Sequence, residues 1–363
     1  MTSREPYDLA IVGSGIMGLC AAFIAATSES YQHLVVIDQN GIGSGASGYA
    51  PGIQISVGRG QREQELAVRG TKFWQEMYPG GSWPVGRNCK LFWLTRSVSK
   101  IKQMSTTGEM VQSSRAEVNS QLSSLPGLAV PDGVGVVSDQ CSYSPVKHVV
   151  LDLARRLRAC GVTFEERFNV ASITQRAGMM IIQAPTGVEL LARRVIVAIG
   201  PWLPNSPLRE ALGRTPVVRV KKVVSLHLAV KPSPSCPAIG LVGDYAFLIP
   251  MIEEGYWLFS FTSEEWDVRP NSDELKVSED DVARAYTILA NWFPSDAPKI
   301  ASSRVFCDCY STDTIPFAHP AHSMAGVAIV GGGAGNGFRF GPGCAKDALE
   351  IVRNYPRNMR LPT

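Results

Sequence analysis

The sequence predicts a mixed α/β and α+β fold, in which pieces of a parallel sheet are interleaved along the chain with an antiparallel sheet. Two apolar runs that end in glycine turns, Leu9–Val12 and Arg193–Gly200, are typical of buried parallel strands. Between residues 215 and 265, apolar and polar residues alternate with a period of two, which indicates antiparallel strands with one face available for a pocket. The 363 residues suffice for about two domains.

The first apolar run leads into a glycine turn and then a helix. Gly13, Gly15 and Gly18 have the G-x-G-x-x-G spacing, and the helix continues from Leu19 to Ala26. The first glycine permits a tight turn, the second lets a pyrophosphate approach the backbone, and the third lets the helix pack closely on the strand. The amides and positive dipole end of the helix N-terminus suit a diphosphate. The segment therefore predicts a Rossmann-like dinucleotide site.

A second strand supports this interpretation. His33–Ile37 is apolar and ends at Asp38, about 20 residues after the last glycine, where a ribose-binding carboxylate is expected. The small residues of Asn40–Gly48 then allow the backbone to approach the phosphates and ribityl portion of a cofactor.

The remaining elements follow from periodicity and turn residues. We expect helices over about 62–78, 144–161, 273–292 and 344–354, strands over 162–164, 169–173 and 327–330, and a glycine-rich turn over 331–343. Residues 86–140 are mixed, and their Ser/Thr/Gln-rich middle predicts helix and loop outside the main sheet.

Composition excludes several classes of function. The chain has 35 basic and 32 acidic residues without a basic block, so binding to nucleic acid or a membrane surface has no electrostatic support. The five histidines and eight scattered cysteines show no metal-ligand spacing, and we expect reduced thiols and no metal site. Without a signal-peptide core or an apolar stretch long enough to span a bilayer, we expect a cytoplasmic protein.

Together these segments resemble, over almost the whole chain and in the same order, the FAD-dependent D-amino-acid oxidase, glycine oxidase and sarcosine oxidase superfamily. The resemblance is nearest to its monomeric sarcosine-oxidase-like branch. It is carried by the first glycine turn and by Gly45–Gly48, Ser144–Pro145, Val197–Trp202 and Gly335–Phe340, of which the last is similar to the family's Gly-His-Gly-Phe-Lys-Phe.

The resemblance implies a Rossmann-like FAD-binding domain with an interleaved antiparallel-sheet substrate domain. It assigns residues 1–85, 144–207 and 306–363 to the FAD-binding domain, and residues 86–143 and 208–305 to the substrate domain.

The resemblance also implies which residues bind FAD. The pyrophosphate is assigned to Gly13, Ser14, Gly15, Ile16, Met17 and Gly18, and the adenosine ribose to Asp38. The ribityl-flavin portion is assigned to Ser44, Ala46 and Ser47, and the adenosine side to Val170, Gly200 and Trp202. The isoalloxazine is assigned to Gly335, Asn336, Gly337 and Phe338, followed by Arg339 and the last helix, whose N-terminus stabilises negative charge.

For the substrate, the resemblance points first to Arg339. In the family the cation at this position binds the carboxylate of the amino acid, and arginine offers a planar bidentate partner. Aromatic residues of the antiparallel sheet are further pocket candidates, with Tyr245 preferred, Trp257 second, and Phe247 and Phe259 after them.

The chain also departs from the branch. The branch has an arginine pair soon after the small-residue loop, whereas Arg59 and Arg62 come later here and suit a solvated face equally well. The branch lysine that accelerates the reaction with oxygen has no counterpart in Tyr256–Phe261. Covalent attachment of the flavin through Cys307 or Cys309 stays an open alternative to a flavin held by contacts alone, with Cys307 slightly preferred.

The expected activity is oxidation of the C–N bond of an amino acid or related amine, with hydride transfer to flavin N5 and formation of an imine. Oxygen or another acceptor then takes the electrons. Two alternatives stay open: a dehydrogenase of the same fold that uses an acceptor other than oxygen, and a flavin-binding subunit of a heteromeric amine oxidoreductase.

Overall fold

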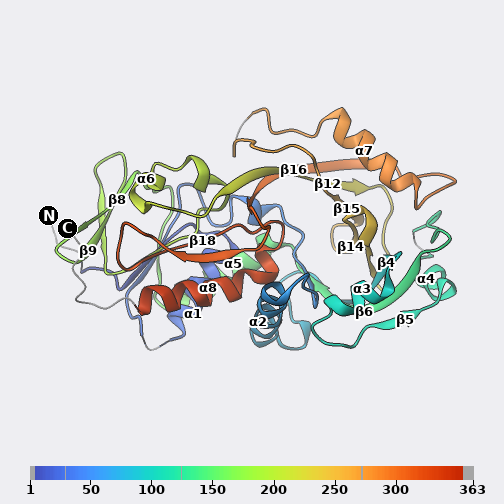
Figure 1. Cartoon of the computed structure of the whole chain (residues 1–363), viewed down its shortest axis with the longest axis horizontal. Helices are drawn as coiled ribbons and strands as arrows, with labels where there is room; N and C mark the ends of the chain where they lie inside the picture. Colours follow the sequence, from blue (N-terminus) through green and yellow to red (C-terminus); the bar gives the residue numbers. More distant parts are fainter. Residues whose placement is uncertain (1–4, 29, 124, 271–272, 355–363) are drawn as a thin grey trace. The chain divides into compact units, whose positions relative to one another are not determined.

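The computed structural model describes residues 5–28, 30–123, 125–270 and 273–354 (Figure 1). The chain forms two compact units, called here the first and the second unit. The first comprises 1–50, 146–220 and 308–363, and the second comprises 51–145 and 221–307. These bounds differ from those that the family resemblance implies: residues 208–220 belong to the first unit, and residues 51–85, 144–145 and 306–307 belong to the second. Residues 51–85 join the second unit because β3 (Ile53–Ile55) pairs with β6 (Gly135–Tyr143).

The first unit contains a six-stranded sheet in the order β17-β18-β11-β1-β2-β7. All neighbours are parallel except β17, which runs antiparallel to β18 at one edge. Strands β1, β2, β11 and β18 are apolar and buried along their length, as strands covered on both faces must be. The bounds are β1 Leu9–Val12, β2 Leu34–Ile37, β7 Thr163–Glu165, β11 Val195–Val197, β17 Phe317–Pro320 and β18 Val327–Gly331.

Helices and a small sheet complete the first unit. Helix α1 packs against both α5 and α8. A three-stranded antiparallel sheet, β10-β9-β8, contributes to the same hydrophobic cluster as Val12, Ile37 and Val197 of the parallel sheet. The bounds are α1 Ile16–Ala26, α5 Val146–Ala159, α6 Leu208–Leu212, α8 Gly337–Arg353, β8 Ser172–Arg176, β9 Met179–Gln183, β10 Glu189–Ala192, η1 Ala46–Gly48 and η3 Gly200–Asn205.

Helix α8 begins earlier than the sequence predicts. The expected start was near residue 344, but the helix already includes the glycine-rich residues 337–343, with Pro342 inside it. The small residues serve close packing on α1, because a Cβ added at Gly341 would lie 3.4 Å from Met17. Glycine here lets two helices approach rather than ending one.

The second unit contains a large sheet in the order β16-β12-β15-β14-β13-β4-β6-β3, with β5 beside β6. Its pairs of known register are antiparallel except β13–β4, which is parallel. The bounds are β4 Arg87–Thr95, β5 Val111–Ser113, β12 Val218–Leu228, β13 Ala238–Leu241, β14 Ala246–Met251, β15 Tyr256–Phe261 and β16 Ile300–Ser311. Strands β12 and β16 each cross from one unit into the other.

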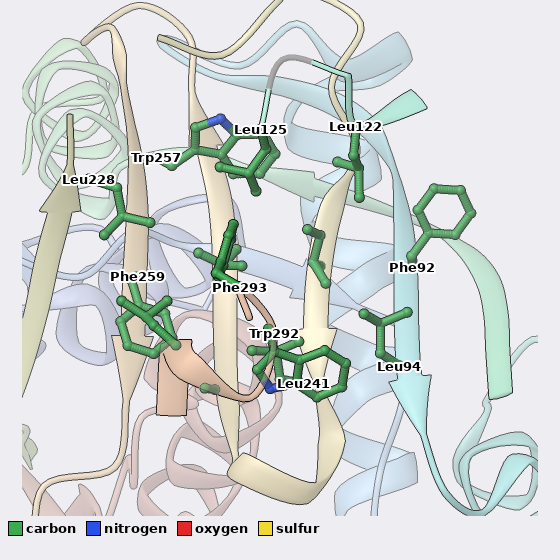
Figure 2. Packing of buried hydrophobic residues seen from close by; sticks show 14 of the residues in the cluster. Phe92, Leu94, Leu122, Leu125, Leu228, Leu241, Trp257, Phe259, Trp292 and Phe293 are labelled. Carbon is green, nitrogen blue, oxygen red and sulfur yellow. The ribbon is translucent and has the colours of Figure 1, made fainter. Parts of the chain in front are cut away.

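One face of this sheet is covered by a hydrophobic cluster (Figure 2). Residues of β12, β14 and β15 pack there against Val118 of α4 and against Ala285 and Leu289 of α7. The helices of the second unit, α4 and α7 included, have these bounds: α2 Gln61–Met77, η2 Pro79–Gly81, α3 Val98–Met104, α4 Arg115–Gln121, η4 Val242–Asp244 and α7 Glu279–Ala290.

Helix α7 is shorter than the predicted helix over 273–292. It starts at Glu279 because Ser278 and Asp281 form a capping box. The Asp281 amide donates to Ser278 Oγ at 3.2 Å, and the Ser278 amide donates to the Asp281 carboxylate at 2.9 Å.

Candidate functional site

In the first glycine turn, Gly13 and Gly18 have no room for a side chain. Gly13 has φ +109°, and a Cβ there would lie 2.3 Å from the Ala198 carbonyl oxygen. A Cβ at Gly18 would lie 2.0 Å from the Gly13 carbonyl oxygen. These contacts match the tight turn and the close helix–strand packing that the glycine spacing predicts.

The N-terminus of α1 is available to an anion. Its N-cap is Gly15, which has no side chain to cap the first amides, and its first turn has no acidic residue. The Ile16 amide donates to Ser47 Oγ at 2.9 Å, so the small-residue loop Asn40–Gly48 is attached to this helix end. The helix dipole and the amides left by the missing cap suit a phosphate group.

Asp38 lies at the carboxyl end of β2 and is fixed by the same turn. The amide and hydroxyl of Ser14 donate to one of its carboxylate oxygens at 2.8 and 2.7 Å, and the Asn40 amide donates to the other at 2.9 Å. A carboxylate offers about four acceptor positions, so Asp38 keeps capacity for a hydroxyl.

The small-residue loop and η3 lie against each other. The Gly43 amide donates to the Ser14 carbonyl at 3.1 Å, which places the loop with Ser44 and Ala46 beside the first turn. A Cβ at Gly45 would lie 2.8 Å from the Trp202 ring. Gly200 begins η3 with φ +54°, and the Val170 side chain is buried in the core, which leaves only its backbone for an adenine.

The C-terminal turn is held by Asp308, a residue that the sequence analysis missed. Ala334 and Gly335 both have positive φ, at 48° and 76°. The Gly335 amide and the Cys309 amide each donate to the Asp308 carboxylate at 2.7 Å. Burial raises the pKa of this carboxyl above its ordinary value, and the two amide hydrogen bonds oppose that shift.

Asp308 also bears on the cysteines beside it. Side chains of consecutive strand residues point to opposite faces, so the thiol of Cys309 points away from the face on which Asp308 contacts the Gly335 turn. Cys307 and Cys309 are both buried. The alternation of side chains along β16 was the sequence signal that places Asp308 on the opposite face from Cys307 and Cys309.

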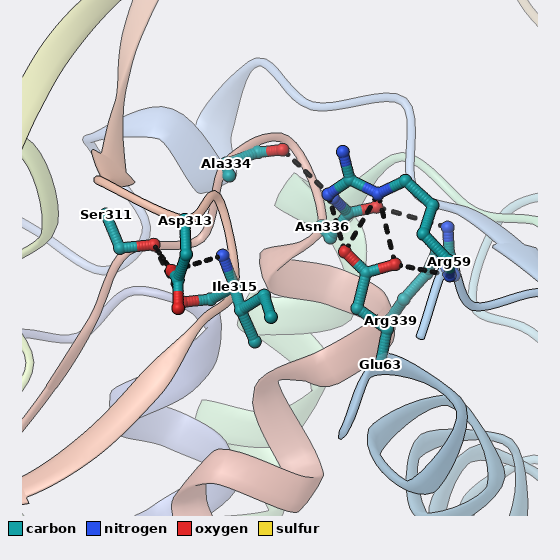
Figure 3. A network of polar contacts seen from close by, with 8 residues as sticks. All are labelled: Arg59, Glu63, Ser311, Asp313, Ile315, Ala334, Asn336 and Arg339. Atoms are coloured by element: carbon teal, nitrogen blue, oxygen red, sulfur yellow. Dashed lines mark hydrogen bonds and ion pairs between the residues drawn. The ribbon is translucent and has the colours of Figure 1, made fainter. Parts of the chain in front are cut away.

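Arg339 lies in the first turn of α8 and is 8% exposed. Its guanidinium donates to the Asn336 side-chain oxygen at 3.1 Å and lies 4.5 Å from the centre of the Phe340 ring. Asn336 in turn donates to the Ala334 carbonyl at 2.9 Å (Figure 3). The arginine is therefore coupled through one side chain to the backbone of the glycine turn.

The packing of α1 on α8 brings the two glycine turns together within the first unit. A Cβ at Gly337 would lie 3.6 Å from Ile16 and 3.8 Å from Met17. The buried Phe338 follows directly. Residues more than 300 positions apart in the sequence thus place two helix N-termini side by side, and both carry a positive dipole end.

In the second unit, the aromatic candidates do not form a pocket. The side chains of Trp257 and Phe259 are fully buried in the hydrophobic cluster (Figure 2), so the expectation that Trp257 contacts a substrate is not supported. Tyr245 is 76% exposed in a left-handed turn, φ 49°, between β13 and β14. Phe247 points to the opposite face, where its ring packs at 5.6 Å from that of Trp93.

That opposite face carries a polar cluster that sequence reasoning also missed: Ser302, Arg304, His227 and Tyr256. His227 Nδ1 lies 2.7 Å from Ser302 Oγ, and Arg304 Nε donates to His227 Nε2 at 3.0 Å. Arg304 also hydrogen-bonds Tyr256, whose ring stacks on His227 at 4.0 Å. Burial and the Arg304 charge lower the pKa of His227 to about 4, so the imidazole is neutral at pH 7.

The remaining basic candidates have internal partners. Arg59 forms an ion pair with the buried Glu63 at the start of α2 (Figure 3), and Arg62 lies 3.8 Å from Glu65. Among the described residues, no helix is long and apolar enough to cross a membrane, and no three His, Cys, Asp or Glu side chains are grouped to hold a metal ion.

A glycine turn, a carboxylate after the second strand and two adjoining helix N-termini define a dinucleotide-binding protein. The model of the family described as FAD dependent oxidoreductase matches residues 8–351, and the chain belongs to this family. The family resemblance and the fold class expected from the sequence are confirmed.

Solved structures show the same fold at low sequence identity. L-proline dehydrogenase from P. horikoshii aligns with TM-score 0.82 and 13% identity, over 97% of this chain and 95% of that chain. Glycine oxidase from Geobacillus kaustophilus aligns with TM-score 0.76 and 18% identity, over 97% and 96%. Iminodiacetate oxidase from Chelativorans sp. BNC1 aligns with TM-score 0.74 and 17% identity, over 97% of each chain. A comparison with curated proteins finds no match.

Proposed function

We propose that this FAD-dependent oxidoreductase oxidises the C–N bond of an amino acid or a related amine. The observation that carries the substrate class is Arg339, a largely buried cation in the first turn of α8, directly after the glycine turn. Its guanidinium offers a planar, bidentate partner for a carboxylate, and a partly desolvated site strengthens that pairing. Glycine oxidase and iminodiacetate oxidase, which share the fold, are named for substrates of this chemical class.

Features of the first unit support FAD binding at the positions expected from the sequence. The space that a Cβ at Gly13 or Gly18 would fill is needed by the backbone. The N-cap of α1 is Gly15, which has no side chain, and Ser47 occupies the Ile16 amide. In our proposal, the α1 amides bind the pyrophosphate, Asp38 binds the ribose, and the N-terminus of α8 stabilises negative charge on the flavin. When bound, FAD would supply N5 as the acceptor for a hydride equivalent from the carbon next to the substrate nitrogen, and the substrate would become an imine.

The protein's own contribution to the reaction is positioning. Arg339 holds the carboxylate and thereby orients the α-carbon, while Asn336 fixes the guanidinium relative to the turn. No strong protein base is required when the amine arrives neutral.

We infer a flavin held by contacts alone. Asp308, not a thiol, faces the Gly335 turn, which argues against attachment through Cys307 or Cys309. Unfolding the yellow holoenzyme in acid tests this inference: all of the colour is expected to leave with the filtrate, and colour retained on a Cys307 or Cys309 peptide would contradict it.

We favour oxygen as the electron acceptor, with a dehydrogenase as the first alternative. The fold accommodates both, since its relatives include a proline dehydrogenase and a glycine oxidase. The absence of a lysine from Tyr256–Phe261 supports the dehydrogenase, and it also keeps the heteromeric subunit as a second alternative. Peroxide production on an amino-acid panel separates them. An oxidase forms peroxide in air, a dehydrogenase bleaches its flavin anaerobically but forms no peroxide in air, and an isolated subunit does neither.

The central experiment is anaerobic bleaching of the flavin across a panel of amino acids and of the matching amines without a carboxylate. We expect Arg339→Ala to weaken apparent binding of carboxylated substrates about 10- to 100-fold, the range for loss of a charged hydrogen-bond pair. Arg353→Ala, at the other end of the same helix, is the matched control and is expected to leave bleaching unchanged. Equal bleaching by wild type and Arg339→Ala with carboxylated substrates would refute the role of Arg339.

A further inference from the structure

Two cysteines face each other across neighbouring strands of the second unit. Cys89 in β4 is the register partner of Cys141 in the antiparallel strand β6. Their sulfur atoms are 3.3 Å apart. Side chains directly opposite each other in an antiparallel pair have Cβ atoms within about 5.5 Å, so this proximity is fixed by the sheet itself and not by a mobile loop.

The two thiols have different surroundings. Cys141 is buried in a cluster with Ile55, Leu91 and Val137, whereas Cys89 is only half-buried at the margin of that cluster. Cys89 is therefore the residue of the pair that is partly open to solvent.

The pKa values of the two thiols are shifted in opposite directions. The hydrogen bond from the Cys141 thiol lowers the pKa of Cys89 against the effect of burial, with help from the Ala238 amide and the nearby charge of Arg87. Donating that hydrogen bond and being buried raise the pKa of Cys141. Cys89 is thus the sulfur disposed to become a thiolate, and Cys141 is the sulfur that stays protonated beside it.

We propose that Cys89 and Cys141 form a redox-active pair that a hydroperoxide converts into an intramolecular disulfide. In the first step, the Cys89 thiolate attacks one oxygen of the peroxide; the O–O bond breaks, and after proton uptake a sulfenic acid and one water or alcohol result. In the second step, the Cys141 sulfur attacks the Cys89 sulfur, and the hydroxyl leaves with the Cys141 proton as water. The two thiols lose two electrons, which the peroxide gains.

The geometry needs little adjustment for this bond. A disulfide requires a sulfur separation of about 2.05 Å and a Cβ separation of about 3.5–4.5 Å, so the sulfurs must approach by somewhat more than 1 Å. Rotation of both side chains and a small approach of the paired strands supply that distance. The bond would close a loop containing β5 and α4, and it would fasten β4 to β6 in the large sheet.

The test uses the purified holoenzyme, exposed to a small molar excess of hydrogen peroxide, then unfolded and alkylated with N-ethylmaleimide. Of the eight cysteines, we expect eight to be alkylated before peroxide and six after it, with all eight restored by dithiothreitol. Peptide mapping is expected to find Cys89 joined to Cys141. Eight alkylated thiols after peroxide, or a disulfide between other cysteines, would overturn the proposal.

Three variants resolve the two steps. Cys141→Ser is expected to stop at the sulfenic acid, which dimedone traps on Cys89, and Cys89→Ser is expected to give neither product. Cys160→Ser removes an exposed cysteine outside the pair and is the matched control, so its Cys89–Cys141 disulfide is expected to form as in wild type. Dimedone labelling of Cys141 in the Cys89→Ser variant at the wild-type rate would contradict the assignment of Cys89 as the attacking thiol. These readouts do not depend on the proposed amine oxidation.

Discussion

The ammonium of Lys222 lies 2.9 Å from a carboxylate oxygen of Asp281, and both side chains are buried in the second unit. Lys222 belongs to β12, and Asp281 belongs to the first turn of α7, where it also completes the capping box with Ser278. The same ammonium pairs with the half-exposed Glu265. This ion pair therefore attaches the start of α7 to the large sheet.

Removing one partner of this ion pair should lower the free energy of unfolding. Lys222→Met leaves the buried Asp281 carboxylate without its cation, and breaking a buried pair in this way costs about 3 kcal/mol of unfolding free energy. Urea unfolding at pH 7 measures the loss. Lys231→Met, which replaces an exposed lysine beyond the same strand, is the control and should change stability by less than about 0.5 kcal/mol. A loss for Lys222→Met no larger than that of the control would show that the pair is not stabilising.

Stability should fall in mild acid because of His227. Its pKa is about 4 in the folded protein against 6.5 as the ordinary value, since burial and Arg304 disfavour the imidazolium. Between these values the unfolded chain binds a proton that the folded protein does not, so unfolding becomes easier as the pH drops from about 6.5 toward 4. His227→Gln should remove this part of the pH dependence. Urea midpoints from pH 8 to 4 measure it, and curves of identical slope for the two proteins would contradict the shift.

Gly18 of the first glycine turn allows a test of the proposed FAD site. Gly18→Ala places a Cβ 2.0 Å from the Gly13 carbonyl oxygen, so α1 must move away from β1 at an overpacking cost of about 1–3 kcal/mol. We expect FAD binding to the apoprotein, followed by flavin fluorescence, to weaken at least about tenfold. Gly60→Ala has no atom within 4 Å of the new Cβ and an extended backbone, so it should bind FAD as wild type does. Unchanged affinity of Gly18→Ala would exclude this turn from the cofactor site.

The features predicted from the sequence were those set by local chemistry. Gly13 and Gly18 lie five positions apart, and each has a steric reason to be glycine that the spacing alone reveals. Arg339 was identifiable because it follows a recognisable run of residues. The start of α8 was not, since residues 337–343 look like a glycine loop until their packing on α1 is known.

The sequence could not show which face of the large sheet is the core. Tyr256–Phe261 presents side chains to both faces, and the burial of Trp257 follows from contacts with α4 and α7, which are distant in sequence. For the same reason the partners of His227 on the other face were not predictable, because Arg304 reaches it from a strand 77 residues later. The pairing of strands that are distant in the sequence, and not the local pattern of residues, determines which face of the sheet these side chains occupy.

Asp308 allows a direct test of the C-terminal turn. Its carboxylate accepts two backbone amides at 2.7 Å, and hydrogen bonds to a charged acceptor contribute about 1.5–3 kcal/mol each. Asp308→Ala should therefore loosen the turn at Gly335 and weaken FAD binding about 10- to 100-fold. Asp313→Ala is the matched control, because Asp313 accepts from Ser311 and Ile315 in the neighbouring turn (Figure 3) but not from Gly335. Titration of each apoprotein with FAD gives the dissociation constants. If Asp313→Ala weakens binding as strongly as Asp308→Ala, the loss reflects general destabilisation of this region and the specific role of Asp308 is refuted.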